Sequence, residues 1–178
     1  MALRTILTEE DKQLYKVSRE VTTFGGRIDI LLDDMRETLI ESEGVGLAAP
    51  QVGILRRVVL VMDTNKEDLT PEEQIIELIN PVIVSTEGEQ DGLEGCLSVP
   101  GIYGYVKRPY RVTVKAFDRT GKEFLVTGEG LTARAFCHEI DHLDGHLYKE
   151  FAYKVLTPEE LEALEKSYSE DNMEEDAE

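Results

Sequence analysis

The sequence predicts an α+β fold, in which antiparallel or mixed β-sheets surround a central helix with an H-E-x-x-H sequence, and an N-terminal and a C-terminal helix flank them. Two observations support this class. Apolar residues recur at helical spacing within 28–39, 130–144 and 157–167, and short β-branched runs separate the first two segments. With 178 residues and 41% hydrophobic content, the chain can bury a single core.

The first helix is indicated by apolar residues at positions i, i+3, i+4, i+7 and i+11, namely Ile28, Leu31, Leu32, Met35 and Leu39. This spacing places them on one stripe that would face the core. We expect Gly44 to end the helix, because glycine readily adopts the backbone conformations found just beyond helix ends.

Strands are expected over 57–62, 76–86, 111–117 and 123–127, which are rich in β-branched and aromatic residues. The turn-type sequence 118–121 would join the last two strands as a hairpin. The polar segment 63–73 between the first two strands is expected to be a loop.

The central helix, about 130–144, shows three separate faces at about 100° per residue. One face is apolar, with Phe136, Ile140, Leu143 and Leu147, another holds Leu131, Ala135, His138 and His142, and the third holds Arg134, Cys137, Asp141 and Asp144. A helix with apolar groups on two sides is largely buried, and buried histidines need polar partners or a metal ion.

His138 and His142 are four residues apart, with Glu139 beside the first. Positions i and i+4 lie on the same side of a helix, so both imidazoles could bind one metal ion while the glutamate reaches a bound water. Alternatively, two core histidines hydrogen-bond to each other and to backbone carbonyls, and Glu139 is a surface charge. The pattern alone leaves both interpretations open.

A hydrolytic metal site needs three protein ligands and one open position, so a third ligand elsewhere in the chain favours a metal. Cys96 is the better candidate, since it follows a glycine and precedes a strand-like run, 97–99, that ends at Pro100. His146 is poorer, because Gly145 is expected to end the helix before it.

The segment 43–53 is small, apolar and rich in glycine, so its backbone could approach a ligand closely. It also supplies one amide side chain, Gln51. The segment lacks the Gly-Lys-Ser/Thr ending and the Gly-x-Gly-x-x-Gly pattern of phosphate-binding loops, which argues against a nucleotide site.

Three segments together, GVGLAAPQ at 44–51, EGCLS at 94–98 and HEIDH at 138–142, closely resemble the three signature motifs of the bacterial peptide deformylases, in the same order. The resemblance spans roughly residues 3–148. It implies a hydrolase that removes the formyl group from the N-terminal formyl-methionine of new polypeptides and releases formate.

The resemblance also implies roles for individual residues. Cys96, His138 and His142 would bind the metal, and Glu139 would act as the acid and base. Gln51 and the Leu97 backbone N–H would face the formyl oxygen, and Gly46 is assigned to the same catalytic group. Glu94 and Arg108 resemble the buried ion pair that the family carries behind the metal strand.

Gly44, Val45, Leu97 and Ala135 are the residues that we expect to line the pocket for the methionine side chain. An unbranched thioether requires a narrow apolar slot, and glycine allows close approach of the formyl group. One position departs from the family pattern: Cys137 stands where many members carry glutamine. It points about 100° away from His138 on the helix, so we interpret it as a packing residue.

One sulfur and two nitrogen ligands suit zinc, iron, cobalt or nickel. The family resemblance favours Fe(2+) as the physiological ion, with Ni(2+), Co(2+) or Zn(2+) as further ions that purified protein could carry. A disulfide between Cys96 and Cys137 is disfavoured, because a metal-bound thiolate cannot share its sulfur.

Two alternatives belong to other classes of protein. A zinc endopeptidase of the usual H-E-x-x-H type would take a ligand downstream of the helix, for which Glu150 is available. A non-enzymatic protein with a closed structural site would need Cys137 or His146 as a fourth ligand, and neither points toward the histidine pair.

Charge divides the chain unevenly. The net charge is −18, and residues 157–178 hold ten of the 37 acids and one of the 19 bases. We therefore expect a catalytic domain over 1–156 and a C-terminal segment over 157–178 with a short helix, which Thr157 and Pro158 begin, and disorder beyond Ser167.

This acidity disfavours a nucleic-acid surface, and we expect no DNA partner. No segment has the length of a membrane span or the form of a secretory signal, so we expect a cytoplasmic protein with no membrane partner. We also expect a monomer that acts on N-formylmethionyl nascent peptides and meets the ribosome only transiently, not through its acidic tail.

Overall fold

The computed structural model describes residues 2–175, and the side chains of α4 as far as Asp171. The elements in chain order are η1 (Lys12–Tyr15), α1 (Arg27–Glu41), β1 (Gly46–Ala48), η2 (Ala49–Val52), β2 (Val58–Met62), α2 (Pro71–Gln74), β3 (Ile75–Glu87), β4 (Gln90–Cys96), β5 (Val99–Arg108), β6 (Arg111–Phe117), β7 (Glu123–Glu129), α3 (Leu131–Leu143), η3 (Tyr148–Glu150), β8 (Lys154–Val155) and α4 (Pro158–Glu175).

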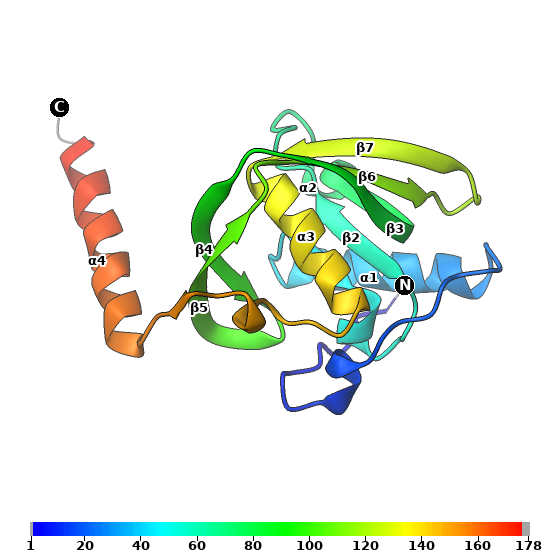
Figure 1. Cartoon of the computed structure of the whole chain (residues 1–178), viewed down its shortest axis with the longest axis horizontal. Coiled ribbons are helices and arrows are strands. Elements are labelled where there is room, and N and C mark those ends of the chain that lie inside the picture. Colours follow the sequence, from blue (N-terminus) through cyan, green and yellow to red (C-terminus); the bar gives the residue numbers. More distant parts are fainter. Residues whose placement is uncertain (1, 176–178) are drawn as a thin grey trace.

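The strands form two sheets. A five-stranded sheet has the order β1-β2-β3-β6-β7, and a three-stranded sheet has the order β4-β5-β8. All strand pairs in both sheets are antiparallel, and the one parallel contact among the described residues is an isolated bridge between Arg19 and Arg56. Figure 1 shows α3 enclosed between the two sheets. The expected α+β class is confirmed.

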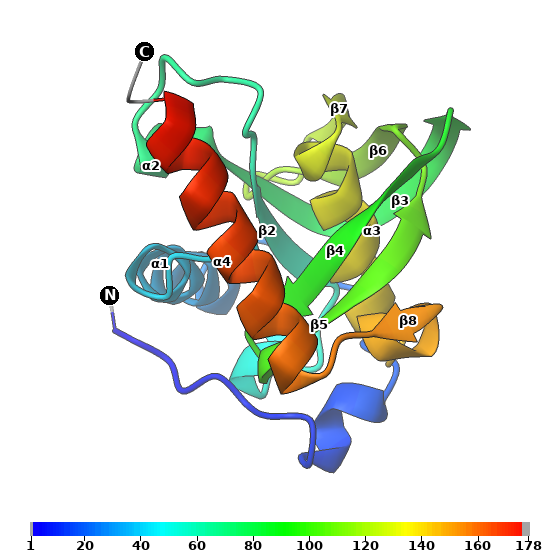
Figure 2. The ribbon, with the colours of Figure 1, turned by 90° about the vertical axis from the view of Figure 1, so that its left-hand side faces the viewer.

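The core has a layered arrangement, because the central strands of the larger sheet bury both faces. On β2, Val58 and Leu60 pack against α1, whereas Val59 and Val61 pack against α3. Figure 2 shows β2 between these two helices. Successive side chains of a strand point to opposite faces, which explains why β2 is apolar throughout instead of alternating. Burying each such side chain contributes about 1.5–3 kcal/mol.

Most of the expected elements are confirmed, with small shifts in their bounds. The strand over 111–117 agrees with β6, and 57–62 and 76–86 agree with β2 and β3. The pairing of β3 with β6 shifts register between Ile79 and Val82, where Pro81 interrupts the ladder. The segment 63–73, expected to be a loop, ends in the start of a short helix, α2, which a Thr70–Glu73 capping box begins.

The hairpin that carries the second motif differs from expectation. The run 97–99 does not form a strand that ends at Pro100. Leu97 and Ser98 form the turn between β4 and β5, and Val99 begins a ten-residue strand. Proline is tolerated near the first residue of a strand, so Pro100 did not mark an end. This turn is what places Cys96 at the tip of β4.

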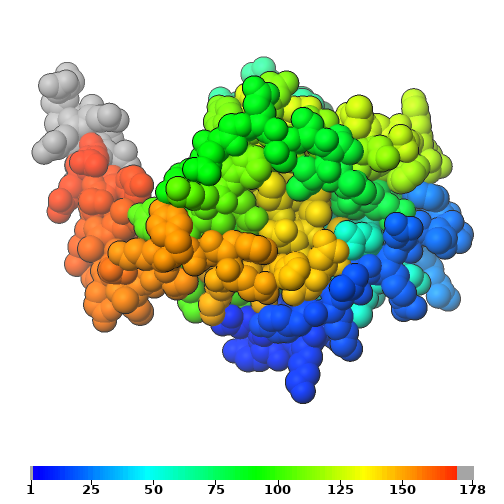
Figure 3. All heavy atoms as spheres, in the orientation of Figure 1, coloured from blue at the N-terminus to red at the C-terminus, as the bar shows by residue number. Residues whose placement is uncertain are grey.

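The C-terminal helix is longer than expected. Thr157 and Glu160 form a reciprocal cap at its start, and Lys166 pairs with Glu162 one turn away at 2.9 Å. These contacts favour helix, and α4 continues to Glu175. The helix therefore passes the expected end near Ser167, and the last part of the tail, 176–178, lies outside the described residues. Figure 3 shows the start of α4 joined to the body of the molecule at its edge.

No helix in the described part of the chain is both long enough and apolar enough to cross a bilayer.

Candidate metal centre

Helix α3 places both histidines of the H-E-x-x-H sequence inside the molecule. His138 and His142 are 8% and 1% exposed, and their ring centroids lie 5.0 Å apart. The helix ends at Leu143, and Gly145, two residues further on, has a φ of +78°. A Cβ at that position would lie 2.5 Å from the Tyr15 carbonyl oxygen, so only glycine lets the N-terminal segment pack against this end of the helix.

Cys96 at the end of β4 joins the histidine pair. Its Sγ lies 3.4 Å from His142 Nε2, and one ligand atom from each of Cys96, His138 and His142 lies within 4.8 Å of the others. A tetrahedral ion with metal–sulfur and metal–nitrogen bonds of about 2.3 and 2.0 Å separates such ligands by roughly 3.5 Å. The donor set and its spacing therefore fit one divalent metal ion.

Glu94 orients the first histidine from behind. Its Oε2 lies 3.0 Å from His138 Nδ1, and Arg108 donates to both carboxylate oxygens at 2.7 and 3.0 Å. Burial opposes the charge of Glu94, but hydrogen bonds from His138 and Arg108 outweigh it and hold the pKa of Glu94 at about 2. A carboxylate only accepts, so Nδ1 carries the proton and Nε2 keeps its lone pair for a metal. The expected Glu94–Arg108 ion pair is present.

Glu139 is buried at the same centre, with 5% of its surface exposed. Its Oε2 is enclosed without a hydrogen-bond partner in the described chain. Burial raises the pKa of Glu139 to about 7, the charge of His138 opposes the shift, and the charges of Glu94 and Asp141 add to it. A carboxyl group with a pKa near neutrality can both take up and release a proton at working pH.

Gly46 makes room for that carboxylate. A Cβ on Gly46 would lie 2.6 Å from Glu139 Oε1 and 2.7 Å from its Cγ. Real Cβ atoms do not approach other heavy atoms so closely. The backbone of the glycine-rich segment therefore packs directly against the side chain of Glu139.

Gln51 points its amide group toward the metal ligands. The side chain is 1% exposed, and its Oε1 accepts a hydrogen bond from the Ala48 N–H at 2.9 Å. This contact directs Nε2 toward Ser98 Oγ at 3.1 Å and Cys96 Sγ at 3.5 Å. Ser98 is fully buried and belongs to the second motif, but no sequence pattern marked it as a site residue.

One cavity of about 450 Å³ adjoins the centre. Its lining includes the expected pocket residues Gly44, Val45, Leu97 and Ala135, together with Cys96, His138, Glu139, Gln51 and Gly46. Leu131 also lines it, as its place on the helix face of the two histidines indicates, and so do Arg134, Leu93 and Tyr103, which no sequence pattern marked as pocket residues. Their places depend on how β4, β5 and α3 pack, which no local pattern records.

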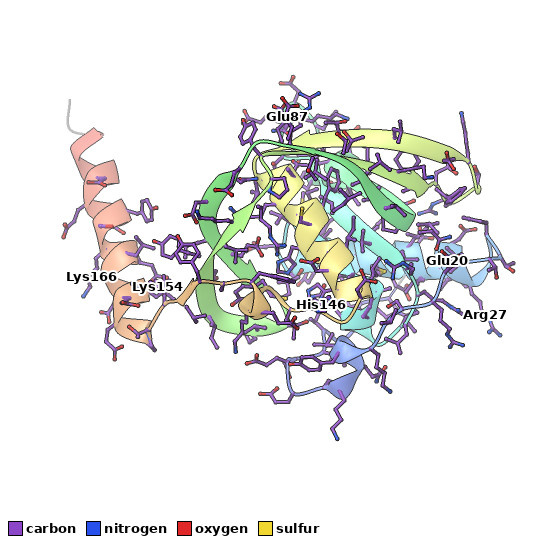
Figure 4. All side chains as sticks on the ribbon, viewed as in Figure 1. Glu20, Arg27, Glu87, His146, Lys154 and Lys166 are labelled. Atoms are coloured by element: carbon purple, nitrogen blue, oxygen red, sulfur yellow. The ribbon has the colours of Figure 1, made fainter. Side chains whose placement is uncertain are left out.

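The rejected ligand candidates lie elsewhere. His146 lies beyond the end of α3, as Figure 4 shows, and its Nδ1 is 2.9 Å from Glu150 Oε2. Glu150, the residue that a zinc endopeptidase would use as its third ligand, is therefore paired with His146. Cys137 packs in the core between α3 and the larger sheet, where burial raises the pKa of its thiol to about 11. Both cysteines are free thiols.

A half-buried thiol and two buried imidazoles line one cavity together with a carboxyl group that has no hydrogen-bond partner among the described residues, and this arrangement defines the class of metal-dependent hydrolases. Comparison with known proteins identifies the family. The family model described as polypeptide deformylase matches residues 3–155, so the chain belongs to the polypeptide deformylase family.

Its relatives agree. The chain is 51% identical over 162 residues to the peptide deformylase of Caldicellulosiruptor bescii, which covers 91% of this chain and 93% of the relative. It is 56% identical over 150 residues to that of Lachnoclostridium phytofermentans, covering 84% and 89%. The crystal structure of a peptide deformylase from Legionella pneumophila has a TM-score of 0.77 at 40% identity, covering 94% and 98%.

A peptide deformylase from Ehrlichia chaffeensis in complex with actinonin is also similar, with a TM-score of 0.79 at 35% identity and coverage of 96% and 98%. The chain is thus an enzyme, a hydrolase of a metal-dependent family that removes the formyl group from the N-terminal formyl-methionine of newly synthesised polypeptides.

Proposed function

We propose that Cys96, His138 and His142 hold one divalent ion and leave its fourth position open to water and substrate. The observation that carries this proposal is the convergence of one thiol and two imidazoles within 4.8 Å, beside an enclosed Glu139 oxygen that has no hydrogen-bond partner among the described residues. When bound, such an ion supplies Lewis-acid polarisation of a carbonyl group and of water.

Glu139 is the proton carrier in this proposal. It takes a proton from the attacking water and delivers it to the leaving amine nitrogen, so that the C–N bond breaks and formate is released. A group positioned in this way contributes about 10²–10⁴-fold to the rate. Gly46 keeps the Glu139 carboxylate in place by leaving the space that it occupies.

Gln51 Nε2 and the Leu97 N–H are the donors that stabilise the formyl oxygen as negative charge develops on it. The Ala48 N–H holds the amide of Gln51 in the orientation that this role requires. Removing one such donor commonly costs about 10²–10³-fold in rate. The formyl carbon carries only a hydrogen atom besides its oxygen and nitrogen. This small group suits a centre that the backbone at Gly44 and Gly46 approaches closely.

The methionine side chain enters the cavity along Gly44, Val45, Leu97 and Ala135. These groups offer apolar contact to an unbranched chain, and the formyl carbon then lies toward Glu139 and Cys96. We assign Fe(2+) as the physiological ion. Nickel, cobalt or zinc would occupy the same ligands in purified protein.

Outside the centre, we propose that the chain is a cytoplasmic monomer that meets ribosomes transiently. The catalytic domain would be 1–156, and the acidic segment 157–178 would not mediate binding, because its charge repels phosphate.

Formate release tests the proposal. The iron-loaded protein, kept anaerobic, should release formate from formyl-Met-Ala-Ser and should leave acetyl-Met-Ala-Ser intact, because the acetyl methyl group meets the crowded face of the centre. If the metal-loaded protein releases no formate, the proposal fails.

A further inference from the structure

Arg134 is a buried cation within the cavity that the proposed mechanism does not use. It lies on α3 one turn before His138, is 6% exposed, and lines the cavity. Its Nη1 donates to Glu94 Oε1 at 3.0 Å and to the Val106 carbonyl at 2.9 Å. Burying an arginine costs free energy unless its N–H donors have acceptors, so the partners of Nε and Nη2 matter as well.

Those other nitrogens are not satisfied by the protein. A guanidinium has five N–H donors, and within residues 2–175 neither Nε nor Nη2 of Arg134 makes a hydrogen bond. Both nitrogens keep some solvent-accessible surface. Among the described residues, the fully enclosed side-chain atoms without a hydrogen-bond partner belong to Ser18, Asp29, Glu139 and His142, and none belongs to Arg134. Arg134 lines the cavity, and its Nη2 lies beside Gly92 of β4, where an added Cβ would be 3.2 Å away.

The apolar residues of the cavity wall cannot distinguish one unbranched side chain from another. Gly44, Val45, Leu97 and Ala135 offer only apolar contact, which a thioether and a methylene group satisfy about equally. Arg134 lies four residues before a metal ligand on the same helix, a rise of about 6 Å. An extended methionine side chain covers a similar length when its formyl group is at the metal.

We propose that Arg134 is a specificity-determining residue that donates a hydrogen bond to the sulfur of the substrate methionine. The proposal rests on the function proposed above. A thioether sulfur is a weak acceptor, whereas the methylene group that replaces it in norleucine accepts nothing. The chain therefore selects formyl-methionine over formyl-norleucine through a charged donor that lies beside the apolar residues of the pocket.

The test compares formyl-Met-Ala-Ser with formyl-norleucyl-Ala-Ser on the full-length iron enzyme. Arg134→Met removes the donors and keeps an unbranched side chain of similar length, and Arg134→Gln is a second variant should the first fold poorly. Leu131→Met is the control, because it changes the same wall without changing its donors. Metal content is measured for each protein.

Wild-type enzyme should prefer the methionine peptide in kcat/KM, and both Arg134 variants should lose about 3- to 10-fold of that preference. The loss should lie in KM for the methionine peptide, because the sulfur does not react and its contact is the same in the ground and transition states. The Leu131 variant should keep the wild-type ratio.

A ratio between two substrates on one protein is independent of the metal-loaded fraction, so damage to the Glu94 network alone does not change it. An unchanged ratio in the Arg134 variants would overturn this proposal while formate release upheld the deformylase activity. Absence of formate with either peptide in the wild type would instead overturn the activity.

Discussion

Gly46→Ala should disable the enzyme by displacing its acid–base group. The added Cβ would lie 2.6 Å from Glu139 Oε1 and 2.7 Å from Cγ, so the carboxylate must move by most of an ångström to reach ordinary contact. Misplacing a catalytic group by about 1 Å can cost about 10²-fold in rate. Overpacking a buried site costs about 1–3 kcal/mol of stability.

The assay is kcat for formate release from formyl-Met-Ala-Ser, together with a thermal melt and the metal content. We expect kcat to fall about 100-fold, the metal to stay at one ion per chain, and Tm to fall by a few degrees, since 1 kcal/mol corresponds to about 2–4 °C in a domain of this size. The effect requires only that Glu139 occupies the position observed in the structure.

Glu139→Gln is the matched background for this test. If the alanine acts by moving Glu139, adding Gly46→Ala to Glu139→Gln should reduce kcat by much less than 100-fold, since the two changes damage the same group. Full activity in Gly46→Ala, or independent losses that multiply in the double variant, would refute the reasoning.

The remaining predictions address the other parts of the centre and the tail. Glu139→Gln alone should keep fold and metal and lose about 10²–10⁴-fold in kcat, so a metal-free variant would show that the role is misassigned. Cys96→Ala should lose most of its metal, whereas Cys137→Ser should keep both metal and rate; equal damage from both would revive a closed site with four protein ligands. Peroxide should inactivate the iron form faster than the nickel form, as timed by residual activity, and equal rates would count against an oxidisable iron–thiolate centre. Truncation after Ser167 should leave hydrolysis of short peptides intact, and co-sedimentation with ribosomes at two salt concentrations should show no binding that depends on residues 157–178.

Local sequence patterns were sufficient to predict features that lie within a single helix. The apolar spacing of Ile28–Leu39 predicted α1, and the H-E-x-x-H sequence predicted two inward-facing histidines on one helix. The partner that brings Cys96 to them lies on a hairpin, β4–β5, whose length the sequence did not reveal. Pro100 and Gly101 resemble a stop signal, and long-range pairing with β4 overrides it.

Contacts between distant segments were the least predictable part of the site. Arg134 lines the cavity because α3 packs beside β4, and Gly46 adjoins Glu139 because β1 lies beside the same helix. Such contacts follow from tertiary packing and leave no periodic signal. The family resemblance supplied Glu94 and Arg108 as a pair, but it did not indicate that Arg134 and His138 share the same carboxylate.

X-ray absorption at the metal edge of the zinc-loaded protein tests the ligand set most directly. The structure predicts one sulfur at about 2.3 Å and nitrogen or oxygen neighbours at about 2.0–2.1 Å, with the sulfur lost in Cys96→Ala and retained in Cys137→Ser. Two sulfur neighbours in the wild type, or none, would contradict a centre built from Cys96, His138 and His142.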